Sequence, residues 1–378
     1  QLTSLDNLRP LQPCCVRMIV GEPHGCRPKV DDQAEVDGTA RWPGVVCRPF
    51  KHELTEGYVV ASPFSQMAAL VADGRIKIVE LQAVPRSMST ALGRCLNESG
   101  ATSVFVNEPF NNMRSDDVDM AAEHVVRSVE PALSWAHEPV VVLSKNMAQY
   151  LSAPVLQTWT DACSAVVWCI RDPRVQISSL LTRLANDTLF GPGSDRLEQS
   201  DLPLSHLPRS PAWPGVLELV TEFLRSSRWS TEFSATGWQA IGAHFTDCVG
   251  RRPSFVADGW LLSRVPDRFL RYLCDGLDLE FRAGMIDRWR EPFLNANQLD
   301  SHPDRRLDPA KAWVNRVATS RGIEAVGREP LEISILPPAL RDHVSEVALP
   351  TYELLIDAFY VQENLAQYRL DRGECPER

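Results

Sequence analysis

The stretch IKIVELQAVPRSMST, residues 76–90, decides how the rest of the chain is interpreted. Its first part, residues 76–81, is mostly apolar and β-branched, which predicts a buried strand. Pro85 predicts a turn, and apolar residues at helical spacing from about Met88 to Glu98 predict a helix that ends at Gly100. A strand that leads through a short turn into a helix is typical of α/β proteins, whose ligands bind beyond the carboxyl ends of parallel strands.

Four more apolar runs along the chain predict strands, and helical sequence lies between them. These runs are residues 103–106, 140–143, 165–170 and 254–257. Continuous apolar strands that alternate with helices favour a parallel sheet covered on both faces. We therefore predict an α/β fold with a P-loop-like parallel sheet flanked by helices.

The composition changes along the chain and suggests where the parts begin. Residues 1–74 are rich in Pro, Gly and Asp and predict an N-terminal extension, whereas residues 75–378 predict the main domain. Within that domain, residues 184–250 predict a helical insertion that would serve as a lid or acceptor-binding region. Helices are expected at about 216–225, 238–249, 266–277 and 352–368.

Overall charge and hydropathy bear on whether the protein binds nucleic acid or a membrane. The 378 residues carry a formal net charge of −10, which disfavours a general nucleic-acid or anionic-membrane surface. The longest apolar run, Ala162 to Ile170, is far shorter than the roughly 20 residues of a membrane helix. We expect no nucleic acid or membrane partner and a cytoplasmic location. Because the chain begins with Gln1, processing of the N-terminus stays open, as does the oligomeric state.

The ten cysteines fall into two groups. Six are scattered through expected elements and the C-terminal tail and predict reduced, mostly buried thiols: Cys95, Cys163, Cys169, Cys248, Cys274 and Cys375. The other four are Cys14, Cys15, Cys26 and Cys47. Their spacing matches no zinc pattern, which favours ordinary thiols over a zinc site or a disulfide. No metal site is predicted.

Two strand ends carry groups suited to phosphate. The turn after the first strand places Arg86 and the hydroxyls of Ser87, Ser89 and Thr90 where a helix begins, and a helix N-terminus favours anions. After the fourth strand, the stretch RDPRVQISS, residues 171–179, places an arginine at the strand end and Ser179 about two helical turns later. Either stretch alone can equally be a helix cap, with Asp172 capping the second helix.

Together these motifs resemble those of sulfotransferases that use 3′-phosphoadenosine 5′-phosphosulfate (PAPS). Residues 85–90, PRSMST, resemble the family's 5′-phosphosulfate loop, and Arg171 to Ser179 resembles its 3′-phosphate motif. The pattern is most similar to a bacterial-type branch in which the loop is followed by Glu-Pro-Phe, here residues 108–110. The segment ending in Arg321 and Gly322 resembles a late nucleotide-contacting segment. The resemblance covers about residues 76–368, and residues 1–74 match nothing known.

The resemblance implies a role for each matching residue. Arg86, Ser87, Met88, Ser89 and Thr90 would hold the 5′-phosphosulfate, Arg171 and Ser179 would hold the 3′-phosphate, and Arg321 and Gly322 would contact the nucleotide. Arg86, where the cytosolic branch has lysine, and Lys145 would stabilise the reacting group. Glu108 would be the base that takes the acceptor's proton, with His124 and His137 as reserves. The donor chemistry requires no metal.

The expected reaction is transfer of the sulfuryl group to a hydroxyl or amine of a small metabolite, and the acidic balance would suit a cationic acceptor. A P-loop kinase that uses ATP is an alternative, although the Gly-Lys-Ser/Thr ending of a Walker loop is absent. A catalytically idle nucleotide-binding protein of the same fold is another. The plain structural alternatives are that Glu108 is a cap or a salt-bridge partner of Arg86, and that Lys145 is a solvated lysine at a strand end.

Overall fold

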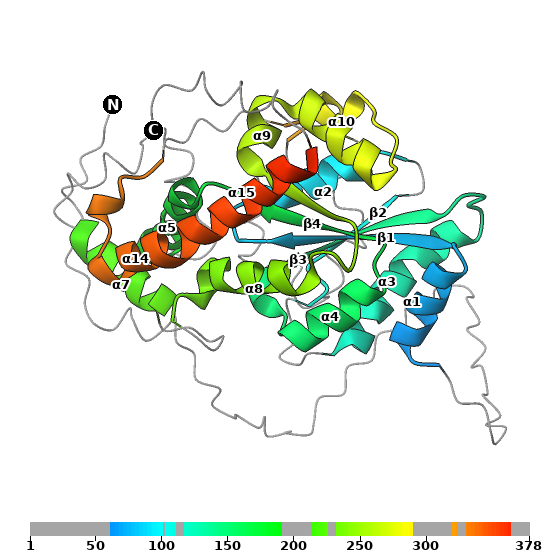
Figure 1. The fold of residues 1–378 in the computed structure, drawn as a ribbon, viewed down its shortest axis with the longest axis horizontal. Coiled ribbons are helices and arrows are strands. Elements are labelled where there is room, and N and C mark those ends of the chain that lie inside the picture. Colours follow the sequence, from blue (N-terminus) through cyan, green and yellow to red (C-terminus); the bar gives the residue numbers. More distant parts are fainter. Residues whose placement is uncertain are drawn as a thin grey trace, which may run out of the picture. The chain divides into compact units, whose positions relative to one another are not determined.

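The computed structural model describes residues 61–100, 103–110, 117–190, 213–225, 232–289, 320–323 and 330–363. These form a five-stranded, wholly parallel sheet with helices on both faces, which confirms the predicted α/β class (Figure 1). The strands are β1 (Ile76–Ala83), β2 (Val104–Asn107), β3 (Val140–Met147), β4 (Ala165–Ile170) and β5 (Ser254–Asp258). All five expected strands are present, with the second shifted by one residue.

The order of the strands places β1 at the centre. The order is β2-β3-β1-β4-β5, so the chain runs along one side of β1 as far as β3 and then crosses to the other side at β4. In sheets of this kind a crevice opens at the carboxyl ends of the strands where the direction of winding changes. The turn that follows β1 lies at that point.

The pairing of the strands sorts their side chains onto two faces. Leu81 pairs with Lys145 and Val167, so these side chains share one face, whereas Glu80 and its partner Ser144 share the other. The first face is covered by α2 (Ser89–Asn97), α9 (Gly259–Arg264) and α10 (Pro266–Leu277). The second is covered by α1 (Pro63–Ala72), α3 (Val118–Leu133), α4 (Ala153–Asp161) and α8 (Trp238–Cys248).

Helix α1 is part of this α/β body. Its Met67 is fully buried, and the Phe64 backbone N–H donates to Asp119 of α3 at 2.9 Å. Of the expected N-terminal extension, residues 1–74, the structure describes only residues 61–74. Residues 1–60 lie outside the described residues. The compact unit that contains the sheet begins at Ala61.

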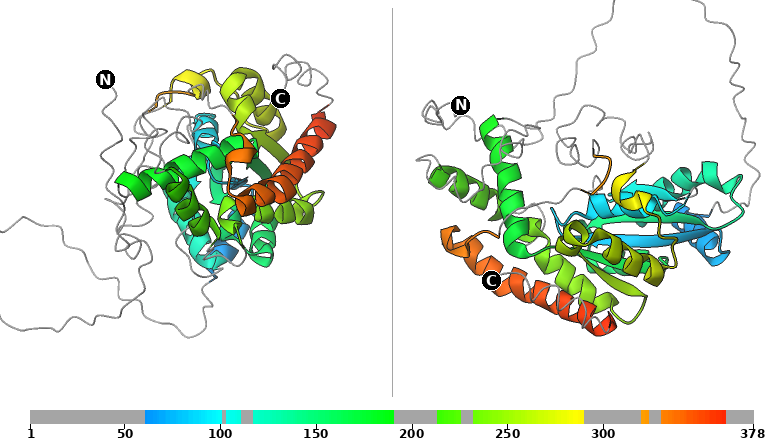
Figure 2. Two further views of the ribbon diagram at one scale, coloured as in Figure 1. Left: turned by 90° about the vertical axis from the view of Figure 1, so that its left-hand side faces the viewer. Right: turned by 90° about the horizontal axis from the view of Figure 1, so that it is seen from above.

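The helices α5 (Pro173–Phe190), α7 (Trp213–Arg225) and α14 (Pro338–His343) lie beyond the carboxyl ends of the strands (Figures 1 and 2), and a second cluster of buried apolar residues lies among them. It joins the three helices through residues such as Ile177, Val220 and Leu340. Helix α14 continues through a π-helical turn at Val344–Ala348 into α15 (Leu349–Glu363). Pro350 has no N–H for a regular helical hydrogen bond, which accounts for the irregular turn. The expected end of this helix, at 368, lies outside the described residues.

The remaining short elements connect these layers. They are η3 (Ala148–Tyr150), η5 (Ser234–Thr236), α11 (Gly284–Asp287) and η7 (Ile333–Ile335). The helices expected at 216–225, 238–249 and 266–277 correspond to α7, α8 and α10. The first two lie in the expected insertion at 184–250.

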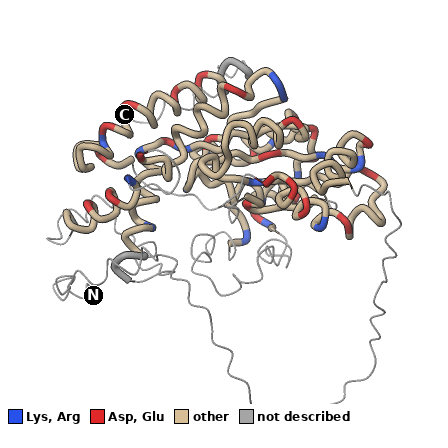
Figure 3. Tube along the Cα trace, turned by 90° about the horizontal axis from the view of Figure 1, so that it is seen from below, with Lys and Arg blue, Asp and Glu red and all other residues tan. Residues whose placement is uncertain are grey.

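The cysteines and the charges of the described residues agree with a folded domain. Cys95, Cys163, Cys169, Cys248 and Cys274 are unpaired and buried, and burial raises the pKa of each thiol. The other expected thiols, Cys14, Cys15, Cys26, Cys47 and Cys375, lie outside the described residues. Acidic and basic residues are interspersed along the described elements (Figure 3). Within these ranges no helix combines the length and apolarity needed to span a bilayer.

Candidate functional site

The turn between β1 and α2 has an unusual backbone. Arg86 and Met88 have φ values of 64° and 67°, in the left-handed region that long side chains seldom adopt. Each such residue costs on the order of 1 kcal/mol, so the surrounding structure must hold it in place. Met88 stands at the N-cap of α2 and gives the helix no side-chain cap. The first N–H groups of α2 are therefore available to an anion.

The two serine hydroxyls of this turn are buried. Ser87 and Ser89 are 2% and 3% exposed, and Ser87 Oγ has no hydrogen-bond partner, whereas Arg86, Met88 and Thr90 are partly exposed. A buried polar atom without a partner costs about 1–3 kcal/mol, so such atoms are uncommon unless a ligand or water completes them. Together with the uncapped helix start, Ser87 makes this turn a candidate anion site.

Helix α5 contacts the turn after β1 through two side chains. The Gln176 amide donates to Pro85 O at 2.9 Å and to Thr236 O at 3.4 Å, and it accepts from Trp238 Nε1 at 3.2 Å. One turn later on α5, Ser179 Oγ accepts from Arg86 Nε at 3.0 Å. The structure thus brings together two motifs that lie 93 residues apart in the chain.

Gly259 lets the turn approach the start of α9 closely. A Cβ atom at this position would lie 2.7 Å from Ser87 O and 3.5 Å from Ile170 O. Ser87 O is a backbone atom that cannot move away cheaply, so only glycine fits, whereas the distance to Ile170 O is an ordinary contact. The turn after β1 is therefore fixed by contacts from α5 and α9.

The second motif follows β4 as expected. Arg171 is 6% exposed at the strand end, and Asp172 accepts from the Arg174 backbone N–H at 2.9 Å and pairs with its guanidinium at 2.7 Å. The bond from Asp172 raises the pKa of Arg174. Asp172 therefore caps α5 as expected, Arg171 stands at the end of β4, and Ser179 contacts Arg86 in the turn after β1.

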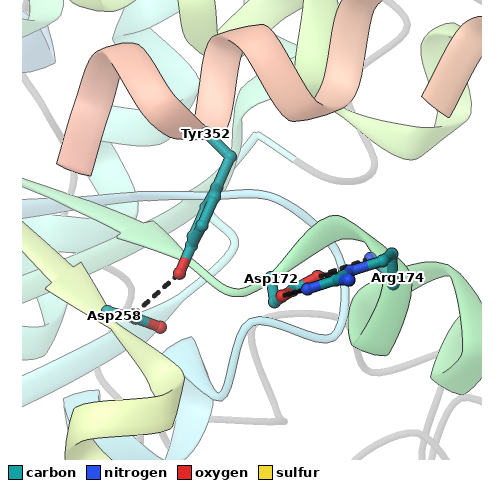
Figure 4. Close-up of polar contacts among 4 residues, drawn as sticks. All are labelled: Asp172, Arg174, Asp258 and Tyr352. Carbon is teal, nitrogen blue, oxygen red and sulfur yellow. Dashed lines mark hydrogen bonds and ion pairs between the residues drawn. The ribbon is translucent and has the colours of Figure 1, made fainter. Parts of the chain in front are cut away.

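A second acidic residue lies at the neighbouring strand end. Asp258, at the end of β5, accepts from Trp260 N at 2.9 Å at the start of α9 and from the Tyr352 hydroxyl at 3.0 Å (Figure 4). Figure 4 also shows the Asp172–Arg174 pair nearby, at the start of α5. Both carboxylates thus cap helices. Within the described ranges, no group of three or more His, Cys, Asp or Glu side chains is placed to hold a metal ion.

The structure also brings Glu108 and Lys145 together. The Glu108 backbone N–H donates to Lys145 O at 2.6 Å, and the two side chains form an ion pair. The Lys145 side chain is 1% exposed, so it is not a solvated lysine, and that of Glu108 is 14% exposed. Glu108 follows β2 with φ of 55°, a third left-handed residue among the expected site residues. The ion pair with Lys145 was not among the roles expected for Glu108.

The remaining candidates lie further out. Arg321 O accepts from Trp289 N at 3.0 Å, and the Trp289 ring stacks under the Arg94 guanidinium of α2 at 4.6 Å. Gly322 packs against the Ile286–Asp287 backbone with no room for a Cβ atom. Arg321 is thus joined to α2 through Trp289, and Gly322 packs against α11.

The two reserve bases differ in their places. His124 lies on α3, where burial lowers its pKa. His137 is exposed and precedes β3, so it lies at the amino edge of the sheet, opposite the edge that carries Glu108.

Three groups of residues were not expected from the sequence. They are Gln176, which bonds to the turn after β1, Gly259, which packs against that turn, and a buried network around Glu80 that includes Asn146 and Trp159. Only Glu80 had a visible signal, because a carboxylate in the middle of an apolar strand is unusual.

The chain resembles some solved structures but no described protein family. No protein-family model matches the chain, and no curated protein matches it. Among solved structures, the chain is similar to mouse sulfotransferase SULT7A1 complexed with PAP, at 11% sequence identity and a TM-score of 0.37, over 75% of this chain and 90% of that one.

Proposed function

We propose that this protein transfers the sulfuryl group of PAPS to a hydroxyl or amine of a small metabolite. The start of α2 carries the proposal: the helix has no side-chain cap, and the buried Ser87 hydroxyl beside it has no partner. Arg86 is adjacent and can clamp phosphate oxygens with two N–H groups. This combination suits the 5′-phosphosulfate, with Met88, Ser89 and Thr90 supplying the first turn of the helix.

The bond between Arg86 and Ser179 explains why a donor with two phosphate positions is proposed. It places the turn after β1 next to α5, where Arg171 and Ser179 can hold a second dianion from two sides. A 3′,5′-bisphosphate would therefore use both halves of the site. ATP would use only one half, and Arg321 and Gly322 would contribute from the α2 side.

The proposed reaction is an in-line displacement at sulfur. A bond forms from the acceptor oxygen or nitrogen to sulfur while the bond from sulfur to the bridging phosphate oxygen breaks, and 3′-phosphoadenosine 5′-phosphate leaves. Glu108 takes the acceptor's proton, and Lys145 and Arg86 stabilise the oxygens that gain charge. The ion pair keeps Glu108 and Lys145 at one strand edge. No metal takes part, and the net charge of −10 suits a cationic acceptor.

Calorimetric titration with 3′-phosphoadenosine 5′-phosphate, run in parallel with ATP, tests the donor site. We expect the bisphosphate to bind more tightly than ATP. Arg171→Ala should weaken it about tenfold or more, because a hydrogen bond to a charged group is lost. The matched control is Arg127→Ala, which removes an equal charge from the exposed surface of α3 and should change nothing.

The other outcomes separate the alternatives. ATP binding as tight as the bisphosphate, or no binding of either, would contradict the proposal, and the former would favour a kinase. Incubation of labelled PAPS with a panel of phenols, alcohols and amines then tests transfer. Tight bisphosphate binding without transfer to any member of the panel would favour a catalytically idle nucleotide-binding protein.

A further inference from the structure

The middle of β1 contains a carboxylate that the proposed reaction does not use. Glu80 is fully buried on the face of the sheet that α4 covers, and it accepts from Gln82 Nε2 at 2.7 Å, Trp159 Nε1 at 2.8 Å and Asn146 Nδ2 at 2.9 Å. Burial raises the pKa of Glu80, against the hydrogen bonds that lower it. A strand gains no stability from a buried carboxyl group that an apolar side chain would not supply more cheaply.

Two partners of Glu80 lead to the same turn. Asn146 Oδ1 accepts from the Phe110 backbone N–H at 3.4 Å, and the Trp159 ring meets the Phe110 ring edge-on, with 5.0 Å between the ring centroids. Phe110 stands two residues after Glu108, whose left-handed backbone requires support. Both routes from Glu80 therefore end at the turn that presents Glu108.

We propose that Glu80 is a positioning residue that orients Asn146 and Trp159 and thereby fixes the Glu108–Phe110 turn. The catalytic meaning of that turn rests on the proposed function. The Glu80 carboxylate can only accept hydrogen bonds, and its three donors are Gln82, Asn146 and Trp159. Asn146 must therefore turn its amide nitrogen toward Glu80, which leaves its oxygen facing Phe110 N. The polarity of one buried group thus sets the direction of the next hydrogen bond.

An exchange of donor and acceptor distinguishes this role from simple burial. Glu80→Gln places an amide nitrogen among three donors, which forces Asn146 or Trp159 to give up its bond. The double variant Glu80→Gln/Asn146→Asp reverses the bond between the two residues and keeps the total charge. The new carboxylate still accepts from Phe110 N. Gln82, whose Oε1 has no partner, can turn over to accept.

Hydrogen exchange of the full chain, measured by mass spectrometry on the peptide that contains Phe110, provides the test. We expect exchange of this amide to be about tenfold faster in Glu80→Gln and to return to within about twofold of the wild-type rate in the double variant. Thr160→Val is the matched control, because it removes a buried hydroxyl from α4 that bonds only to its own helix and to Cys248. It should leave this amide unchanged.

An unchanged rate in Glu80→Gln, or a double variant that stays fast, would overturn the inference. Bisphosphate titration of the same proteins keeps the two proposals separate. Binding should stay within about twofold of wild type in Glu80→Gln, because the turn after β1 is held by other residues. If the wild type did not bind the bisphosphate, the proposed function would be contradicted, but the hydrogen-exchange result would still test the role of Glu80. With an identified acceptor, Glu80→Gln should lower kcat and leave the KM for PAPS unchanged.

Discussion

Ser87 illustrates, at the scale of a single residue, how a ligand site differs from a structural cap. Its hydroxyl is buried without a partner, so it contributes nothing favourable to the folded chain alone. Ser87→Ala should therefore keep or raise the free energy of unfolding, by up to about 1 kcal/mol, while bisphosphate affinity falls about tenfold. Denaturant unfolding and calorimetry measure the two effects.

Ser263→Ala is the control for this prediction, because its nearly buried hydroxyl donates to Trp260 O at 2.9 Å. This variant should lose about 0.5–1.5 kcal/mol of stability and keep its affinity. If Ser87→Ala destabilised the protein as Ser263→Ala does, Ser87 would be a structural residue.

The ion pair of Lys145 and Glu108 should behave as a coupled unit. Lys145→Met removes the buried cation that pairs with the largely buried Glu108 carboxylate, which should cost about 2 kcal/mol or more of unfolding free energy. Adding Glu108→Gln removes the carboxylate charge as well and should recover part of that loss. A double-mutant cycle by urea unfolding measures the coupling, and additive losses would show that the two side chains act independently.

At the scale of whole elements, the turn after β1 depends on how α5 and α9 approach it. Gly259→Ala would bring a Cβ atom against Ser87 O and displace the turn. We expect a loss of about 1–3 kcal/mol together with weaker bisphosphate binding, because overpacking forces backbone shifts.

Gly215→Ala in α7 offers the comparison, since nothing lies within 4 Å of its new Cβ. It should stabilise the protein by up to about 1 kcal/mol, because alanine favours helix, and leave affinity unchanged. Thermal unfolding and calorimetry on both variants check the pair. Wild-type affinity in Gly259→Ala would mean that the turn tolerates displacement.

For the molecule as a whole, buried histidines set the response to acid. Burial lowers the pKa of His244 and of His343 to about 4, and for His343 the carboxylate of Glu232 opposes this shift. Their folded-state pKa lies below the unfolded value, so the unfolded chain binds more protons and stability falls as pH drops below about 6.5. Glu80, whose pKa burial raises, acts in the opposite sense: its contribution is present at low pH and is lost as pH rises.

We expect the free energy of unfolding to fall between pH 7.5 and 5, by up to about 2 kcal/mol for each of the two histidines. His343→Gln, whose side-chain amide can still form a hydrogen bond with Thr236 Oγ1, should reduce this fall by about that amount. The exposed His137 provides a control, since His137→Gln should leave the fall unchanged. Chemical denaturation at both pH values measures it, and an equal fall in His343→Gln would show that His343 does not carry the effect.

Much of the fold was predictable from the sequence because its signals are local. Each strand is an apolar run of a few residues. The six residues of β4 are all buried, and the sequence predicts them as a buried strand because all six are apolar. Pro173 and Pro266 mark helix starts that the structure places at the same residues. The end of α2, expected at about Glu98, is at Asn97 in the structure, within about one residue.

The chain alone determined the α/β class, the positions of the strands, and which polar residues follow them. The tertiary structure decided the strand order and the partners of those residues. Arg86 meets Ser179 across 93 residues, Glu80 meets Trp159 across 79, and Lys145 meets Glu108 across 37. The physical reason is that strand periodicity and helix capping depend on neighbours in sequence. A buried side chain instead takes its hydrogen-bond partner from whichever strand or helix the packing places beside it.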